Sequence, residues 1–196
     1  AYRRAWMVQM ITRQPRIFDA QIVGSLRQGT SFFASSALIG LGGVLAIGAN
    51  TAPLESLAEA FSRTDLPPLV WQVKLVPVLL FLTNAFLKFV WANRLFGYAS
   101  VIMAAVPNEP EDQTALPRAA QAAEVNIRAA WNFNRGLRSM YFALAALAWL
   151  AGPIALAVAV AFTLWTLWSR EFASASRRVL LSEELPAEGG LGPFGG

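Results

Sequence analysis

Three long apolar runs decide what this chain can fold into. Residues 30–49 form an uncharged stretch of about 20 residues, the length that an α-helix needs to cross a bilayer. A second run covers residues 69–91, and a third covers residues 137–168. A typical soluble domain carries about 25% charged residues, whereas this chain carries 14% and is 56% hydrophobic. The runs therefore predict an all-α, polytopic helical membrane protein.

The third run contains a break near its middle. Residues 137–168 are too many for one untilted span, since a helix rises about 1.5 Å per residue and the hydrocarbon core is about 30 Å thick. Gly152 and Pro153 stand near the centre, and such a pair favours a turn or a kink. The run is therefore either one long kinked helix or a tight hairpin of two short spans.

The distribution of arginines favours the hairpin. Residues 1–29 carry five arginines, residues 91–136 carry four and the segment after residue 168 carries three, whereas the loop 50–68 carries only Arg63. Cytoplasmic loops are enriched in Lys and Arg, so the three arginine-rich segments belong on one side, and the third run must then cross twice. We predict three or four spans in a bacterial inner membrane, with amphipathic helices on the cytoplasmic side. The spans are about 30–49, 69–91, 137–151 and 153–169.

The remaining segments belong to the same membrane domain. We expect one helical domain over residues 1–180 and a mobile Gly/Pro-rich tail over 181–196. Residues 1–14 mix apolar and aromatic residues with arginines, which is typical of a helix lying in the headgroup plane. An alanine-rich helix is expected over 119–131. Because the sequence begins at Ala1 and not at Met, we expect the protein to continue upstream.

Polar residues recur on one face of the second span. Asn84 and Lys88 belong to a stripe with spacings of three and four residues, which places its members on one side of a helix. An unpaired amide in hydrocarbon is unfavourable, so Asn84 must face protein, water or a partner. It is either an interhelical hydrogen-bonding residue or part of a cationic lining for an anion or a lipid headgroup. The stripe consists of Lys74, Pro77, Phe81, Asn84, Lys88 and Trp91.

A second polar stripe follows the alanine-rich helix into the third run. It is either a solvated face or the wall of a vestibule for an anionic group, because guanidinium groups suit anions better than protons or metal cations. The stripe consists of Gln121, Glu124, Arg128, Asn132, Arg135 and Ser139.

Several cations and amides fall near the predicted cytoplasmic ends of the spans. A basic side chain there gains about 1 kcal/mol from an anionic membrane surface, so lipid anchoring explains it without a special function. A binding site for an anion or a lipid headgroup requires instead that these side chains converge in a cleft within the protein. The candidate residues are Asn84, Lys88, Arg94, Asn132, Asn134, Arg135 and Arg138.

The first span is rich in small residues. Small residues spaced four apart let two helices approach closely. They either pack this span within the subunit or build an oligomer. The candidate helix-packing residues are Ser36, Gly40, Gly42 and Gly43.

The sequence lacks the residue types on which many enzymes rely. It contains no histidine and no cysteine, so the commonest general base, the commonest metal ligand and a thiol nucleophile are absent. It also contains no phosphate-binding glycine loop, no zinc-protease helix motif and no nucleophile elbow. We expect no enzymatic activity, no metal, no cofactor and no nucleic-acid partner.

Two classes of function remain. The chain is either an oligomeric anion-binding or anion-conducting membrane protein, or a non-catalytic accessory or structural subunit of a membrane assembly. Either class requires the lipid bilayer together with further copies of the chain or another membrane protein as partners.

Short motifs spread over almost the whole chain form a recognisable set. The set consists of Arg4-x-Trp6-Met7, Arg13-x-x-Arg16-x-x-Asp19-Ala20, Phe32-Phe33-Ala34-Ser35-Ser36, Lys88-Phe89-x-Trp91-x-x-Arg94 with Tyr98, Phe133-Asn134-x-Gly136-Leu137-Arg138-x-x-Tyr141-Phe142, and Arg170-Glu171-Phe172-x-Ser174. With these motifs the chain resembles the family of uncharacterised integral membrane proteins known as domain of unknown function 599. The resemblance implies a membrane location and a multi-span helical fold with one more N-terminal span, and it implies no activity.

Overall fold

The described part of the chain folds into helices joined by short loops. The computed structural model describes residues 2–56 and 66–172, and these residues form no strand. The predicted tail over 181–196 lies outside the described residues. The helices are α1 (Tyr2–Gln9), α2 (Ile17–Ala49), α4 (Pro68–Ala104), α5 (Ala115–Leu147), the short 3₁₀ helix η1 (Ala148–Ala151) and α6 (Pro153–Phe172).

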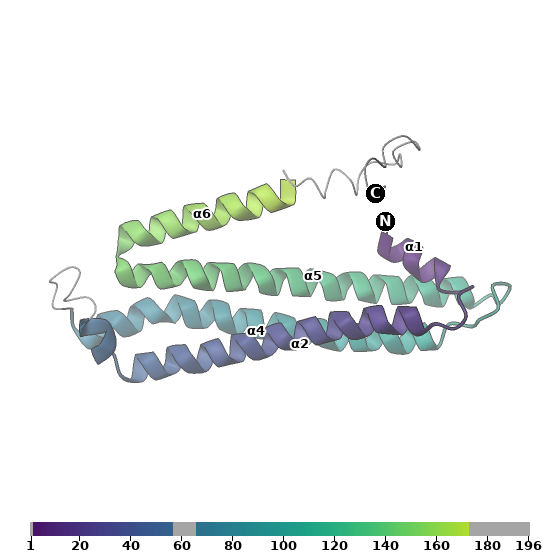
Figure 1. Cartoon of the computed structure of the whole chain (residues 1–196), viewed down its shortest axis with the longest axis horizontal. Coiled ribbons are helices and arrows are strands. Elements are labelled where there is room, and N and C mark those ends of the chain that lie inside the picture. The colour runs from purple at the N-terminus through teal and green to yellow at the C-terminus, as the bar shows by residue number, and fades with distance from the viewer. Residues whose placement is uncertain (1, 57–65, 173–196) are drawn as a thin grey trace, which may run out of the picture.

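Three long helices make up the body of the protein. Helices α2, α4 and α5 lie side by side, and α4 packs against both of its neighbours (Figure 1). Helix α4 has 37 residues and is therefore about 55 Å long, whereas the hydrocarbon core of a bilayer is about 30 Å thick. Helix α4 is thus longer than the hydrocarbon core is thick. We call the end of the bundle that carries α1 and the 105–114 loop the basic end.

Three helices of the described chain have the length and the apolar composition of a membrane span. Helices α2 and α4, and residues Pro153–Arg170 of α6, are long and apolar enough to cross a membrane. The prediction of an all-α, polytopic membrane protein is therefore confirmed. The predicted spans are parts of longer helices, because α2 begins at Ile17 and α4 continues to Ala104.

The third apolar run folds as the predicted hairpin. The chain leaves α5 through η1 and turns at Gly152, and α6 returns along α5 (Figure 1). Gly152 has a φ of 126°, a conformation that a side chain strongly disfavours. Helix α5 is continuous from the alanine-rich segment into the apolar run. The expected cytoplasmic helix and the first arm of the hairpin are therefore one helix, and its crossing of the membrane stays a prediction.

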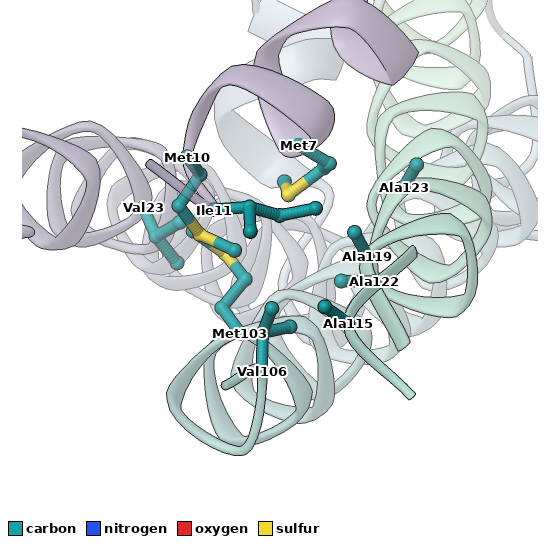
Figure 2. Packing of buried hydrophobic residues seen from close by; sticks show 10 residues of the cluster. All are labelled: Met7, Met10, Ile11, Val23, Met103, Val106, Ala115, Ala119, Ala122 and Ala123. Carbon is teal, nitrogen blue, oxygen red and sulfur yellow. The ribbon is translucent and has the colours of Figure 1, made fainter. Parts of the chain in front are cut away.

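Helix α1 packs against protein at the basic end. Met7 and Met10 are fully buried, and they lie in an apolar cluster with residues of α2, α4 and α5 (Figure 2). The alanines of α5 in this cluster let α1 approach closely. Much of the apolar side of residues 1–14 is thus covered by the bundle, and their location in the headgroup plane stays a prediction. The cluster consists of Met7, Met10, Ile11, Val23, Met103, Val106, Ala115, Ala119, Ala122 and Ala123.

Aromatic rings fill the centre of the bundle nearer the membrane. The Phe33 and Phe89 rings stack with centroids 5.5 Å apart, and Phe133 contacts both of them. Helix α5 reaches this cluster closely because Gly136 faces the Phe89 ring. A Cβ atom at residue 136 would lie 2.6 Å from Phe89 Cε1. A larger residue at this crossing would therefore force the Phe89 ring or the helices to shift.

The orientation of the bundle in the membrane can be tested by labelling. The native chain has no cysteine, so the variants Ser56→Cys and Glu111→Cys each carry a single, exposed thiol. We expect an impermeant maleimide to label the two variants from opposite sides of sealed vesicles, with residue 111 on the cytoplasmic side. Labelling of both variants from the same side would contradict the predicted topology.

Candidate functional site

The two polar stripes predicted from the sequence meet where Asn84 on α4 contacts Ser139 on α5, and most of their other members lie at the exposed edge of this contact. The Phe81 and Phe142 rings stack with centroids 5.7 Å apart, and Asn84 Nδ2 donates a hydrogen bond of 2.6 Å to Ser139 Oγ. A step of three residues forward along α4 is thus matched by three residues backward along α5, as antiparallel packing requires. We call this line of contacts the α4–α5 seam.

The seam accounts for the amide of Asn84. Its hydrogen bond to Ser139 joins two helices, and it satisfies a polar group that would be unfavourable alone in hydrocarbon. This contact favours the interhelical interpretation of Asn84 over a direct role in a cationic lining. Asn84 fixes the register of the α4–α5 seam.

The same register places Lys88 level with Arg135. The next step along the seam is four residues, from Asn84 to Lys88 on α4 and from Ser139 to Arg135 on α5, so both side chains project along the same edge of the seam. Lys88 is half-buried and Arg135 is exposed. Neither makes a hydrogen bond or an ion pair with another residue in the described part of the chain.

The acidic residue nearest in sequence on α5 is already paired. Glu124 forms ion pairs with Arg128, at 3.0 Å, and with Arg4, at 3.7 Å. Asn132 donates its side-chain amide to the carbonyl of Arg128, at 2.9 Å, and so extends this network along α5. The positive charges of Lys88 and Arg135 are thus not neutralised by that carboxylate.

Two other candidate residues line a groove between α5 and α6. Asn134 and Arg138 border a pocket of about 190 Å³ together with Tyr141 and Arg170. Arg170 Nη1 donates a 2.8 Å hydrogen bond to the hydroxyl of Tyr141. The hairpin predicts that α6 lies beside α5, but the sequence does not indicate which of their residues meet, so a site shared by Tyr141 and Arg170 was not predicted.

Arg94 lies apart from the other candidates. It is six residues after Lys88 and therefore about 120° away around α4. Its Nε donates a 2.9 Å hydrogen bond to the hydroxyl of Tyr98 on the same helix. The structure thus brings Lys88, Asn132 and Arg135 together along the α4–α5 seam and Asn134 and Arg138 together in the groove, and it leaves Arg94 on another face.

The small residues of α2 divide between two environments. Gly40 packs inside the subunit, since a Cβ atom there would lie 3.4 Å from a methyl group of Leu82. Ser36 donates its hydroxyl to the carbonyl of Phe32, one turn earlier in the same helix. Gly42 and Gly43 are exposed, and a Cβ atom on either would meet nothing within 4 Å. Close packing within the subunit therefore explains Gly40 but not Gly42 and Gly43.

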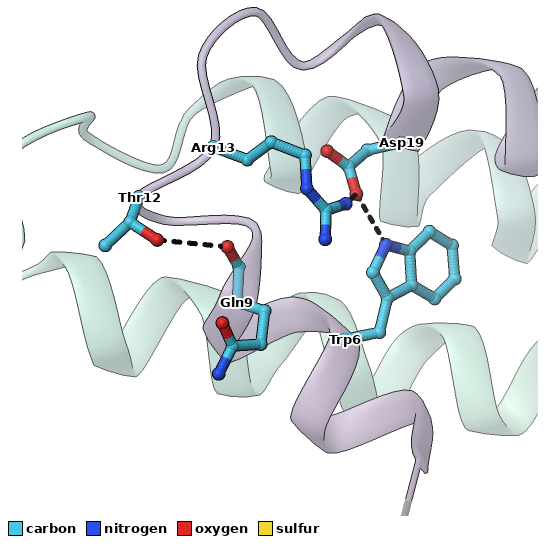
Figure 3. A network of polar contacts seen from close by, with 5 residues as sticks. All are labelled: Trp6, Gln9, Thr12, Arg13 and Asp19. Atoms are coloured by element: carbon cyan, nitrogen blue, oxygen red, sulfur yellow. Dashed lines mark hydrogen bonds and ion pairs between the residues drawn. The ribbon is translucent and has the colours of Figure 1, made fainter.

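A buried carboxylate at the basic end ties α1 to α2. Asp19 is 1% exposed and accepts hydrogen bonds from Trp6 Nε1, at 2.6 Å, and from Arg13 Nη1, at 2.5 Å (Figure 3). Arg16 lies three residues before Asp19, but no ion pair joins the two in the described part of the chain. The Arg16 guanidinium instead donates to the carbonyls of Val106 and Pro107, just after α4.

A second polar contact holds α1 against α5. Arg3 Nη1 donates to Oδ1 of Asn126, a fully buried residue of α5. Burial lowers the pKa of the Arg3 guanidinium, because desolvation disfavours its charged form. The charged residues of the N-terminal segment therefore stabilise its packing on the bundle, in addition to any attraction to lipid.

Comparison with known proteins places the chain in one family. The family described as "Protein of unknown function, DUF599" matches residues 1–176. The chain belongs to this family. No curated protein and no solved structure matches the chain. The family match confirms the resemblance noted from the motifs, and the DUF599 description assigns no activity to it.

Proposed function

We propose that this DUF599 member is a membrane protein that binds an anionic group, a phosphate or a carboxylate, at the α4–α5 seam. Lys88 and Arg135 provide the positive charge. In this proposal the basic end faces the cytoplasm of a bacterial cell, as the distribution of arginines favours. The proposal includes no catalysis: the hydroxyl of Ser139 accepts a hydrogen bond from Asn84, and no paired nucleophile and general base is found among the described residues of the seam.

One observation supports this proposal above the others. The register of the Asn84–Ser139 hydrogen bond puts two cations level with each other, near the predicted cytoplasmic end of the second span. Like charges side by side repel, and the repulsion is relieved when an anion lies between them. An ammonium and a guanidinium together provide several charge-assisted hydrogen bonds to phosphate or carboxylate oxygens.

Binding is better supported than conduction. At the level of Phe89, aromatic rings from α2, α4 and α5 fill the space between the described helices. An ion therefore has no open path between these three helices at that level. Conduction would require a pore between several copies of the chain, with the α4–α5 seam facing its axis.

Binding measurements on charge-neutralised variants test the proposal. We expect Lys88→Gln and Arg135→Gln each to weaken binding about fivefold to tenfold, as expected for losing one partly exposed charged contact. Titration with inorganic phosphate in neutral detergent measures binding of a free anion. Binding to nanodiscs with and without phosphatidylglycerol measures recognition of a lipid headgroup.

The control for this experiment is Arg94→Gln. It removes the same charge from α4 but on another face, and Arg94 contacts only Tyr98 among the described side chains. Its affinity for phosphate and for anionic nanodiscs should change less than twofold, which is less than about 0.4 kcal/mol. Equal weakening by all three variants would contradict a site and would indicate general attraction of a basic surface to anions.

The alternative proposal is an accessory subunit that packs against other membrane helices. The exposed Gly42 and Gly43 of α2 favour it, since small residues let another helix approach. Light scattering of the detergent-solubilised chain gives its mass. If the partner is a second copy, we expect the measured mass to exceed that of one copy and to decrease in the variant Gly42→Leu. A mass equal to that of one copy would exclude the homo-oligomer.

A further inference from the structure

The groove between α5 and α6 has a cationic compartment near the C-terminal end of α6. Arg138 on α5 and Arg170 on α6 line it together with Asn134 and Tyr141, in a volume of about 190 Å³. The Tyr141 hydroxyl accepts a hydrogen bond from Arg170, and its own proton can still be donated to another oxygen. The described residues that line this compartment include no carboxylate.

An apolar compartment continues the groove from the same tyrosine. Tyr141 also lines a second pocket, of about 350 Å³, whose walls come from residues such as Leu144 on α5 and Ala159 and Phe162 on α6. The only hydroxyl groups besides that of Tyr141 belong to Thr163 and Thr166, and Thr166 donates its own to the carbonyl of Phe162. The groove therefore has a charged part and an adjoining apolar part.

We propose that this α5–α6 groove binds one anionic phospholipid. Its phosphate lies against Arg138 and Arg170, whose planar guanidinium groups match phosphate oxygens. The first part of one acyl chain lies in the apolar compartment. The proposal is independent of the α4–α5 seam, because it uses neither Lys88 nor Arg135.

The position of the groove favours a lipid over a free anion. The apolar window of α6 has no residue buried within the described chain, so in a bilayer lipid can reach the groove directly. Trp165 and Trp168, both about 65% exposed, lie in the same last turns of α6 as Arg170. Tryptophans and arginines at a helix end are typical of the headgroup layer, where lipid phosphates lie.

Lipid retention by the purified full chain tests this proposal. Native mass spectrometry in neutral detergent compares dioleoyl phosphatidylglycerol with dioleoyl phosphatidylcholine, which has the same acyl chains but no net charge. We expect about tenfold tighter binding of phosphatidylglycerol and loss of this preference in Arg170→Gln, as expected for one charge-assisted contact. Arg170→Lys should fold normally and keep part of the preference, since it keeps the charge without the planar fork.

The apolar compartment is tested by a matched pair of alanine variants. Ala159→Leu places extra bulk in the groove, whereas Ala157→Leu adds the same bulk to an exposed position of α6 outside it. We expect only Ala159→Leu to reduce retention of the long-chain lipid. Equal retention of the two lipids, equal effects of the two variants, or displacement of the lipid by millimolar inorganic phosphate would each overturn the proposal.

Discussion

Replacing Asp19 with alanine is expected to destabilise the basic end more than loss of any other ion pair in the described part of the chain. The change leaves the Arg13 guanidinium and the Trp6 indole N–H without their shared acceptor. Breaking a buried ion pair costs about 3–5 kcal/mol. Because the Arg13 side chain is 36% exposed, we expect the free energy of unfolding to fall by about 2–4 kcal/mol.

The matched control for Asp19→Ala is Glu124→Ala. Glu124 also pairs with an arginine, but both side chains are exposed, so we expect its loss to cost less than about 1 kcal/mol. Asp19→Asn should lie between the two, because the amide oxygen still accepts from Trp6. Equal unfolding free energies for Asp19→Ala and Glu124→Ala in denaturant titrations would contradict the structural role assigned to this carboxylate.

Gly136→Ala is expected to lower the free energy of unfolding by about 2–3 kcal/mol through overpacking. The new Cβ atom would lie 2.6 Å from the Phe89 ring, which is fully buried between Phe33 and Phe133 and so has little room to move. Unfolding in mixed micelles with increasing dodecyl sulfate measures the change.

The same substitution at Gly42 separates overpacking from helix propensity. A Cβ atom at residue 42 meets nothing within 4 Å, so Gly42→Ala should be neutral or stabilising by up to about 1 kcal/mol. Destabilisation of both variants by the same amount would show that the α4–α5 crossing at Gly136 is less close than the structure indicates.

The helices and the hairpin could be predicted because they depend on local sequence. Apolar runs of membrane length and a glycine–proline pair near the middle of the third run need no knowledge of neighbouring helices. The faces of the polar stripes were also predictable, since spacings of three and four residues define one side of a helix. The hydrogen bond between Asn84 and Ser139 joins the two stripes at one point, whereas Trp91, Gln121 and Arg128 are exposed.

The pairing of distant segments could not be predicted from one sequence. A basic, aromatic segment such as residues 1–14 suits a membrane surface or a protein surface equally well, and its packing against the alanines of α5 could not be predicted from its own sequence. The partner of Asp19 was likewise ambiguous, because both Arg13 and Arg16 are within reach along the chain. Arg170 and Tyr141 meet only because α6 folds back onto α5.

A double-mutant cycle on phosphate binding tests the central claim most directly. If Lys88 and Arg135 hold the same anion, the loss in Lys88→Gln/Arg135→Gln should differ from the sum of the single losses by about 1 kcal/mol or more. The parallel cycle between Lys88 and Arg94 should be additive within about 0.5 kcal/mol. Additive losses for Lys88 and Arg135 would contradict the account, since the two cations would then act as separate surface charges and not as one site.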